Sequence, residues 1–183
     1  LDAIAADPDF GGEVVVVGSD RAGAQGLERA RSAGIPAVAV AVADFPDRAA
    51  WEETLVDALL EHRPDAVVLA GFMRLVSGAF LSHWPDRVVN THPSLLPAFR
   101  GAHAVRDALD YGAKVTGSTV HLVDEKVDHG PVIAQRAVEI REDDDEASLH
   151  ERIKAVEHEL FPHCVKLLCQ GRLTVAGRHV RVS

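Results

Sequence analysis

The stretch Asp65–Ala70, which reads DAVVLA, is a short and nearly continuous apolar run. Runs of this kind are typical of strands whose two faces are both covered by other elements. Before it, residues 48–62 carry apolar side chains at helical spacing, and Pro64 follows just past their end. A helix that leads into a buried strand predicts one repeating unit of a parallel α/β sheet.

The same alternation extends to both sides of this unit. Further apolar runs predict strands, and stretches of helical spacing between them predict helices. The strands are expected at Glu13–Gly18, Ala37–Val42 and Arg87–Asn90, and the helices at Gly26–Ala33 and His103–Tyr111. Strands separated by helices of this length favour parallel pairing through right-handed crossovers.

The pattern changes in the last third of the chain. Gly117–Val123 and Val132–Ile140 are strand-like with only a polar turn between them, so we expect them to pair antiparallel. Ala147–Cys169 predicts one long amphipathic helix, interrupted or kinked at Pro162, and Leu173–Val182 predicts two short strands. We therefore predict an open, doubly wound, mostly parallel α/β sheet with an antiparallel C-terminal extension, in one domain over residues 1–183.

Composition excludes several classes of protein. The 183 residues are 47% hydrophobic and 26% charged, which is typical of one globular domain. The net charge of −9 disfavours a nucleic-acid or membrane-surface binder, because both need a basic face. Cys164 and Cys169 are too few for a disulfide framework, and we interpret both as small core residues of a reduced, cytoplasmic protein.

The densest cluster of chemically useful residues follows the predicted strand Arg87–Asn90. Asn90 and His92 lie two residues apart on extended chain and therefore point to the same side. An amide donor beside an imidazole suits an oxyanion, since Asn donates a hydrogen bond and His a second bond or a proton. The alternative is a strand-end turn that contains a histidine with an ordinary partner.

A second polar segment, Asp124–Asp128, joins the two antiparallel strands. Asp128 is placed where its carboxylate could reach His92 and favour the charged imidazolium. Asp and Gly are also ordinary turn formers, so spacing alone leaves both interpretations open. His129, next along, is expected to be a solvent-side turn residue.

Together these residues resemble the folate-dependent formyltransferase family, over essentially the whole chain. The matching motifs are Asn90–Pro97 (NTHPSLLP), Gly117–His121 (GSTVH), Asp128–Pro131 (DHGP), Leu69–Leu75 (LAGFMRL), Gly26–Arg31 (GLERAR) and Glu157–Pro162 (EHELFP). The resemblance implies a Rossmann-like fold and formyl transfer from 10-formyltetrahydrofolate to the amine of glycinamide ribonucleotide in purine biosynthesis. It implies direct attack through a tetrahedral intermediate, with Asn90, His92 and Asp128 as the catalytic residues and without a metal.

The resemblance also implies binding residues. For the folate these are Arg48, Met73, Arg74, Leu75, Val76, Asn90, Asp124, Glu125, Lys126, Val127 and Asp128, and for glycinamide ribonucleotide Lys154, Ala155, Val156 and Glu157. Read without the resemblance, Met73–Val76 would be plain core at a strand-to-helix junction, and Arg48 a solvent-facing helix residue. Lys154 and Glu157, three apart on one helical face, would be a surface ion pair.

Three other functions stay open. Formyltetrahydrofolate deformylase and methionyl-tRNA formyltransferase share the catalytic residues but differ from this chain in the residues after His92, where it has Pro93. A folate- or nucleotide-binding protein without turnover is the third. Members of the family begin with a strand and a phosphate-gripping loop, which we expect this sequence to lack. The expected partners are small molecules, without nucleic acid or membrane, and a homodimer stays open.

Overall fold

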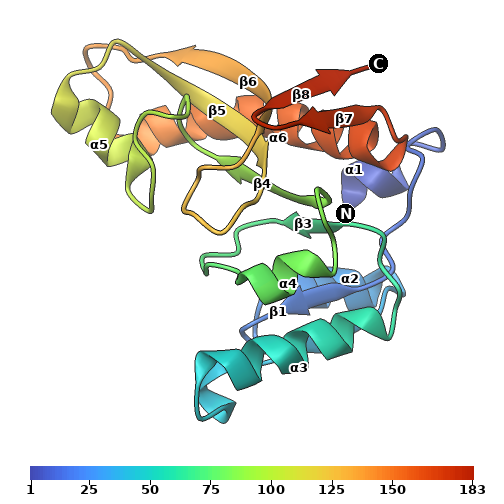
Figure 1. The fold of residues 1–183 in the computed structure, drawn as a ribbon. Coiled ribbons are helices and arrows are strands. Elements are labelled where there is room, and N and C mark those ends of the chain that lie inside the picture. Colours follow the sequence, from blue (N-terminus) through green and yellow to red (C-terminus); the bar gives the residue numbers. More distant parts are fainter.

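The computed structural model describes residues 1–183, and six of the strands form its larger sheet (Figure 1). In spatial order they are β3 (Val67–Leu69), β4 (Val88–His92), β5 (Val115–Leu122), β6 (Val132–Glu139), β8 (His179–Val182) and β7 (Leu173–Ala176). The pairs β3–β4 and β6–β8 are parallel, whereas β4–β5, β5–β6 and β7–β8 are antiparallel. The open α/β sheet is thus confirmed, and so is the antiparallel pairing of β5 with β6.

The remaining two strands form a separate parallel pair. They are β1 (Val17–Ser19) and β2 (Ala37–Ala39), and no strand pairing joins them to β3. Of the strand expected at Glu13–Gly18, only the last two residues enter this ladder, because the preceding residues are extended without a partner strand.

The helices fall close to their expected positions. They are α1 (Asp2–Ala5), α2 (Gln25–Ser32), α3 (Arg48–Leu60), α4 (Gly78–Ser82), α5 (Ala104–Tyr111) and α6 (Glu146–Cys169), with a 3₁₀ turn at Val42–Asp44. The sequence did not predict α4, because its five residues are too short to show a helical period. Ser77 caps α4 by accepting a hydrogen bond from the Phe80 N–H, and Phe80 is buried. None of the helices combines the length and apolar character of a membrane span.

Two clusters of apolar side chains fix the sheet between its helices. Helices α3 and α4 contribute to one cluster with β2 and β3, while α6 packs against β4 and β5 in another. The expected interruption at Pro162 is wrong, since α6 runs from Glu146 to Cys169 with the proline inside. Leu160 and Cys164 on either side of it are buried in the second cluster, which holds both turns in place. Cys169, by contrast, is exposed rather than in the core.

The acidic run before α6 caps that helix, as expected for Asp145. The Asp145 side chain accepts from the Ser148 N–H, and the Ser148 hydroxyl accepts in turn from the Asp145 N–H. Asp144 is paired bidentately with Arg152, with N–O distances of 2.6 and 2.5 Å, and its side chain is only 3% exposed. The hydrogen bonds from Arg152 hold the pKa of Asp144 well below its ordinary value of 3.8.

We expect Asp144→Asn to lower the melting temperature at pH 7 and to do so less in acid. A carboxylate whose pKa is depressed in the folded state stabilises that state above its ordinary pKa, and the contribution disappears as pH falls through the folded value. The difference in melting temperature from wild type should therefore shrink below about pH 4. Asp143→Asn, at the exposed neighbouring position, is the matched control. A difference that is constant from pH 7 to pH 3 would contradict the prediction.

Candidate active site

Asn90 and His92 lie at the carboxyl end of β4 and share one face of the sheet. In the ladder with β5, Asn90 lies opposite His121 and His92 opposite Thr119. Alternate residues of a strand point to the same side, so these four side chains gather on the face opposite Val89, which packs under α6. His92 is 4% exposed and Asn90 is half-buried. The strand therefore presents an amide and an imidazole to a common space.

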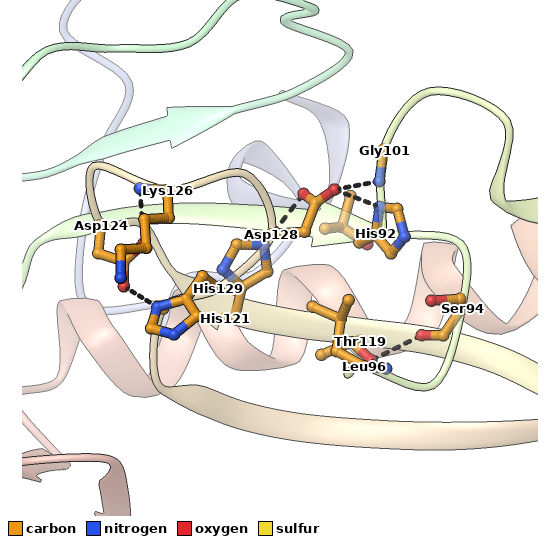
Figure 2. Close-up of polar contacts among 12 residues, drawn as sticks. His92, Ser94, Leu96, Gly101, Thr119, His121, Asp124, Lys126, Asp128 and His129 are labelled. Carbon is orange, nitrogen blue, oxygen red and sulfur yellow. Dashed lines mark hydrogen bonds and ion pairs between the residues drawn. The ribbon is translucent and has the colours of Figure 1, made fainter. Parts of the chain in front are cut away.

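Asp128 reaches this space from the loop between β5 and β6, as Figure 2 shows. Its Oδ2 lies 3.3 Å from His92 Nδ1 and accepts a hydrogen bond of 2.8 Å from the Gly101 N–H. The backbone of Asp128 is left-handed, with φ of 45°, a conformation that costs energy for a residue with a side chain. The structure thus brings Asp128 and His92 together, although they are far apart in the sequence.

The second ring nitrogen of His92 also has a partner. Nε2 lies 2.8 Å from the carbonyl oxygen of Phe99, in the loop that follows β4. A carbonyl oxygen only accepts, so Nε2 must carry the proton in this contact. The Asp128 carboxylate faces Nδ1, so an acceptor lies beside each of the two ring nitrogens.

A buried polar network holds the loop that contains Phe99 and Gly101. The Thr119 hydroxyl donates to the Ser94 carbonyl at 2.6 Å and accepts from the Leu96 N–H at 3.1 Å. Gln135, on β6, donates to both the Thr119 hydroxyl and the Leu96 carbonyl at 2.9 Å. The residues used by this network were missed as functional candidates. The signal that could have found them is Thr119, a polar residue in a strand that is almost entirely buried.

His121 completes the polar surroundings of Asp128. Its Nδ1 donates to the Leu122 carbonyl at 2.8 Å, which leaves Nε2 as an acceptor in the neutral ring. Nε2 is buried without a hydrogen-bond partner and lies 3.8 Å from Asp128 Oδ1. Burial lowers the pKa of His121 and so favours the neutral ring. Two acceptors therefore face each other beside His92. The structure contains no group of three or more His, Cys, Asp or Glu side chains that could hold a metal.

The β5–β6 loop approaches the chain just after Met73–Val76. A Cβ atom added to Gly78 would meet Oε1 of Glu125 at 2.6 Å, so the β5–β6 loop touches the start of α4. Met73, Leu75 and Val127 expose 77%, 47% and 44% of their surface, whereas Val76 is buried. Plain core is therefore the wrong interpretation for Met73 and Leu75. Apolar side chains instead line the open side of both segments.

Side chains of helix α3 hold main-chain groups of the Met73–Val76 segment and of Ser77, which follows it. Arg48 donates to the Leu75 carbonyl, and the buried Glu52 accepts from the Ser77 N–H at 2.9 Å. Glu52 was missed, although it lies at helical spacing with Leu55, Val56 and Leu59 on the buried face. Arg48 is therefore not simply a solvent-facing residue.

Arg74 is held by residues outside the two folate segments. It pairs with Asp20 at 2.5 Å and lies over the ring of Trp51, 5.7 Å from its centroid. These contacts hold the guanidinium group of Arg74, whose side chain is 44% exposed.

The residues expected to bind the nucleotide lie on α6. Lys154 pairs with Glu151 at 2.7 Å rather than with Glu157, so the simple Lys154–Glu157 ion pair is not formed. Burial raises the pKa of Glu157, and neighbouring basic side chains, His158 first among them, partly offset this effect. Ala155 is exposed, and Val156 packs against a third apolar cluster, formed by Val105, Val138, Leu149 and Ile153.

The sequence and the structure are both similar to those of known proteins. The sequence profile of the formyl transferase family matches residues 3–165. A phosphoribosylglycinamide formyltransferase of Mycobacterium tuberculosis is 49% identical over 174 residues, which are 95% of this chain and 80% of that protein. The crystal structure of glycinamide ribonucleotide transformylase 1 from Symbiobacterium toebii superposes with a TM-score of 0.93 at 48% identity, covering 98% of this chain and 86% of that one. A formyltetrahydrofolate deformylase from Pseudomonas syringae is similar at 27% identity and a TM-score of 0.84, covering 93% of this chain and 56% of that one.

Proposed function

Because this chain belongs to the formyl transferase family, we propose that it transfers a formyl group to the amine of glycinamide ribonucleotide in de novo purine biosynthesis. The formyl donor is 10-formyltetrahydrofolate. The observation that carries the proposal is the meeting of Asn90, His92 and Asp128 at the end of β4. The level of identity favours this acceptor over water, since it is 48–49% to the transformylases and 27% to the deformylase.

The reaction begins with attack of the substrate amine on the formyl carbon. A carbon–nitrogen bond forms, the carbonyl electrons move to oxygen, and a tetrahedral intermediate with a negative oxygen results. Asn90 and the charged His92 stabilise that oxygen through N–H donors. In the structure His92 Nε2–H donates to the Phe99 carbonyl oxygen. To donate to the substrate oxygen, it must first break this hydrogen bond.

The second half of the reaction moves protons and expels the folate nitrogen. The attacking amine loses a proton, and we propose that the Asp128 carboxylate accepts it. The folate nitrogen gains a proton, and its bond to the formyl carbon breaks as the carbonyl re-forms. The formyl group never becomes bonded to the protein. Asp128 also holds His92 in its charged, donating form.

For the folate we propose a site bordered by Met73–Val76 and Asp124–Asp128. The exposed apolar side chains of Met73, Leu75 and Val127 offer walls for a flat ring system. Main-chain groups of Arg74, Glu125 and Lys126 offer polar contacts at its edge. Arg48 is half-exposed at the side of this space and supplies a cation for the glutamate tail of the folate.

Lys154→Ala is expected to raise the KM for glycinamide ribonucleotide about tenfold and to leave the KM for formyl folate within about twofold. Loss of one charge-assisted hydrogen bond costs about 1.5–3 kcal/mol, and each 1.4 kcal/mol is a factor of about ten. Steady-state kinetics with each substrate varied in turn measures both values. Lys114→Ala, which removes an exposed lysine at the start of β5, is the control. Equal increases in both KM values would contradict the placement.

The function itself is tested by offering the purified full-length protein 10-formyltetrahydrofolate with different acceptors. We expect tetrahydrofolate to form rapidly with glycinamide ribonucleotide, and neither with buffer alone nor with methionyl-tRNA. Formate release in buffer would identify a deformylase, and formylation of the tRNA would identify the third family activity. Binding of folate without turnover would reduce the function to that of a binding protein.

A further inference from the structure

The C-terminal hairpin of β7 and β8 contacts the loop that contains Asp128. Arg178, in the turn of this hairpin, donates through Nη1 to the carbonyl of His129 and through Nη2 to the carbonyl of Gly130 at 3.4 Å. One guanidinium therefore holds two consecutive carbonyls where the loop returns to β6. Its planar group of donors suits this two-point contact in a way that a lysine ammonium does not.

The two ends of the same loop are tied to each other. His129 Nδ1 lies 2.6 Å from Asp124 Oδ2, and Figure 2 shows the contact that closes the loop. Burial alone would raise the pKa of Asp124, but the hydrogen bond from His129, with further help from Arg178, holds it below its ordinary value. His129, at 31% exposure, is thus a structural partner of Asp124 and not the solvent-side turn residue expected from the sequence.

Apolar packing does little to hold the middle of this loop. Val127 is 44% exposed, and a cavity of about 110 Å³ lies between Asp128, Arg178 and the loop after β4. Asp128 also adopts a left-handed backbone with φ of 45°. A strained residue keeps its conformation only where the surroundings fix it, so polar contacts at the base of the loop matter for its position.

We propose that Arg178, His129 and Asp124 form a latch, which fixes the β5–β6 loop so that Asp128 stays beside His92. Arg178 and His129 are then positioning residues for formyl transfer, an inference that rests on the proposed function of Asp128. The latch also links the C-terminal hairpin to the folate side of the site. Opening it should affect the formyl folate more than the nucleotide, because all of Asp124–Asp128 is assigned to folate contacts and only Asp128 also meets the substrate amine.

The test compares Arg178→Gln with Arg181→Gln, a control on the same hairpin whose side chain is exposed and forms no hydrogen bond or ion pair. Hydrogen exchange of the full-length protein should show the amides of residues 124–129 exchanging at least about fivefold faster in Arg178→Gln, with the rest of the sheet unchanged. Kinetics should show kcat/KM for formyl folate reduced about fivefold to twentyfold and KM for glycinamide ribonucleotide within about twofold. Arg178→Lys should recover only part of the loss.

Exchange and kinetics separate the two hypotheses. Unchanged exchange of the loop in Arg178→Gln, with transfer activity intact in wild type, would overturn the latch and leave the function standing. Faster exchange with no formyl transfer in wild type would overturn the function alone. His129→Ala provides a second variant, and it should accelerate the same amides. If exchange increases throughout the protein in both variants, Arg178 and His129 serve overall stability and the latch is wrong.

Discussion

Replacement of Asp128 by Asn is expected to lower kcat about 1000-fold while the protein stays folded. The amide keeps the shape of the side chain and can still accept from the Gly101 N–H. It removes the negative charge that lies 3.3 Å from His92 Nδ1. It also removes an acceptor for the amine proton. Steady-state rates at saturating concentrations of both substrates measure the loss.

Asp86→Asn is the matched control for this experiment. Asp86 is exposed in the turn before β4 and has the same left-handed backbone, with φ of 56°. The control therefore repeats the change from Asp to Asn in the same conformation without touching the site. We expect its kcat to remain within about twofold of wild type. A loss below about tenfold in Asp128→Asn would show that the Asp128 charge has no part in the chemistry.

Replacement of Asn90 by Ala is expected to lower kcat about 100-fold, with much smaller changes in the KM for either substrate. Asn90 donates to an oxygen whose negative charge exists only in the intermediate and the transition states around it. An interaction made only there lowers kcat when it is lost and leaves ground-state binding nearly unchanged. Rates under saturating conditions and separate KM measurements distinguish the two effects.

Thr91→Val is the control for Asn90→Ala. Thr91 is the next residue of β4, points to the opposite face and meets the Ser118 hydroxyl at 3.3 Å. Its replacement disturbs the same strand without removing a donor from the site, so kcat should stay within about threefold of wild type. An Asn90→Ala variant that loses affinity for folate and keeps its kcat would assign Asn90 to binding and not to the intermediate.

Much of the fold follows from local patterns. Helical spacing predicted α3 and α5 to within two residues at either end, and the short polar turn predicted the antiparallel pair β5–β6. The failures have local causes too. Helix α4 is too short for a period, and an interruption was expected at Pro162 in a helix that tertiary packing carries through. The cap at Ser77 was the available signal for α4.

The candidate site could be predicted only in part. The two-residue spacing placed Asn90 and His92 on one face, because strand geometry is local. The partners of His92 depend on contacts between distant segments, such as the Phe99 carbonyl and the Gly101 N–H, which are main-chain groups present at every position. No pattern of side chains could have identified them. The Arg178 contacts likewise arise only when the C-terminal hairpin folds onto the β5–β6 loop.

The central claim is that formyl passes directly to the substrate amine at Asn90, His92 and Asp128. It is tested most directly by mixing the full-length protein with formyl-labelled 10-formyltetrahydrofolate in a quenched single turnover. We predict that no label becomes covalently attached to the protein, and that no burst of tetrahydrofolate forms before glycinamide ribonucleotide is added. After addition, essentially all label should appear in the formylated nucleotide. Label covalently attached to the protein before the acceptor is added, or label recovered as free formate, would contradict the account.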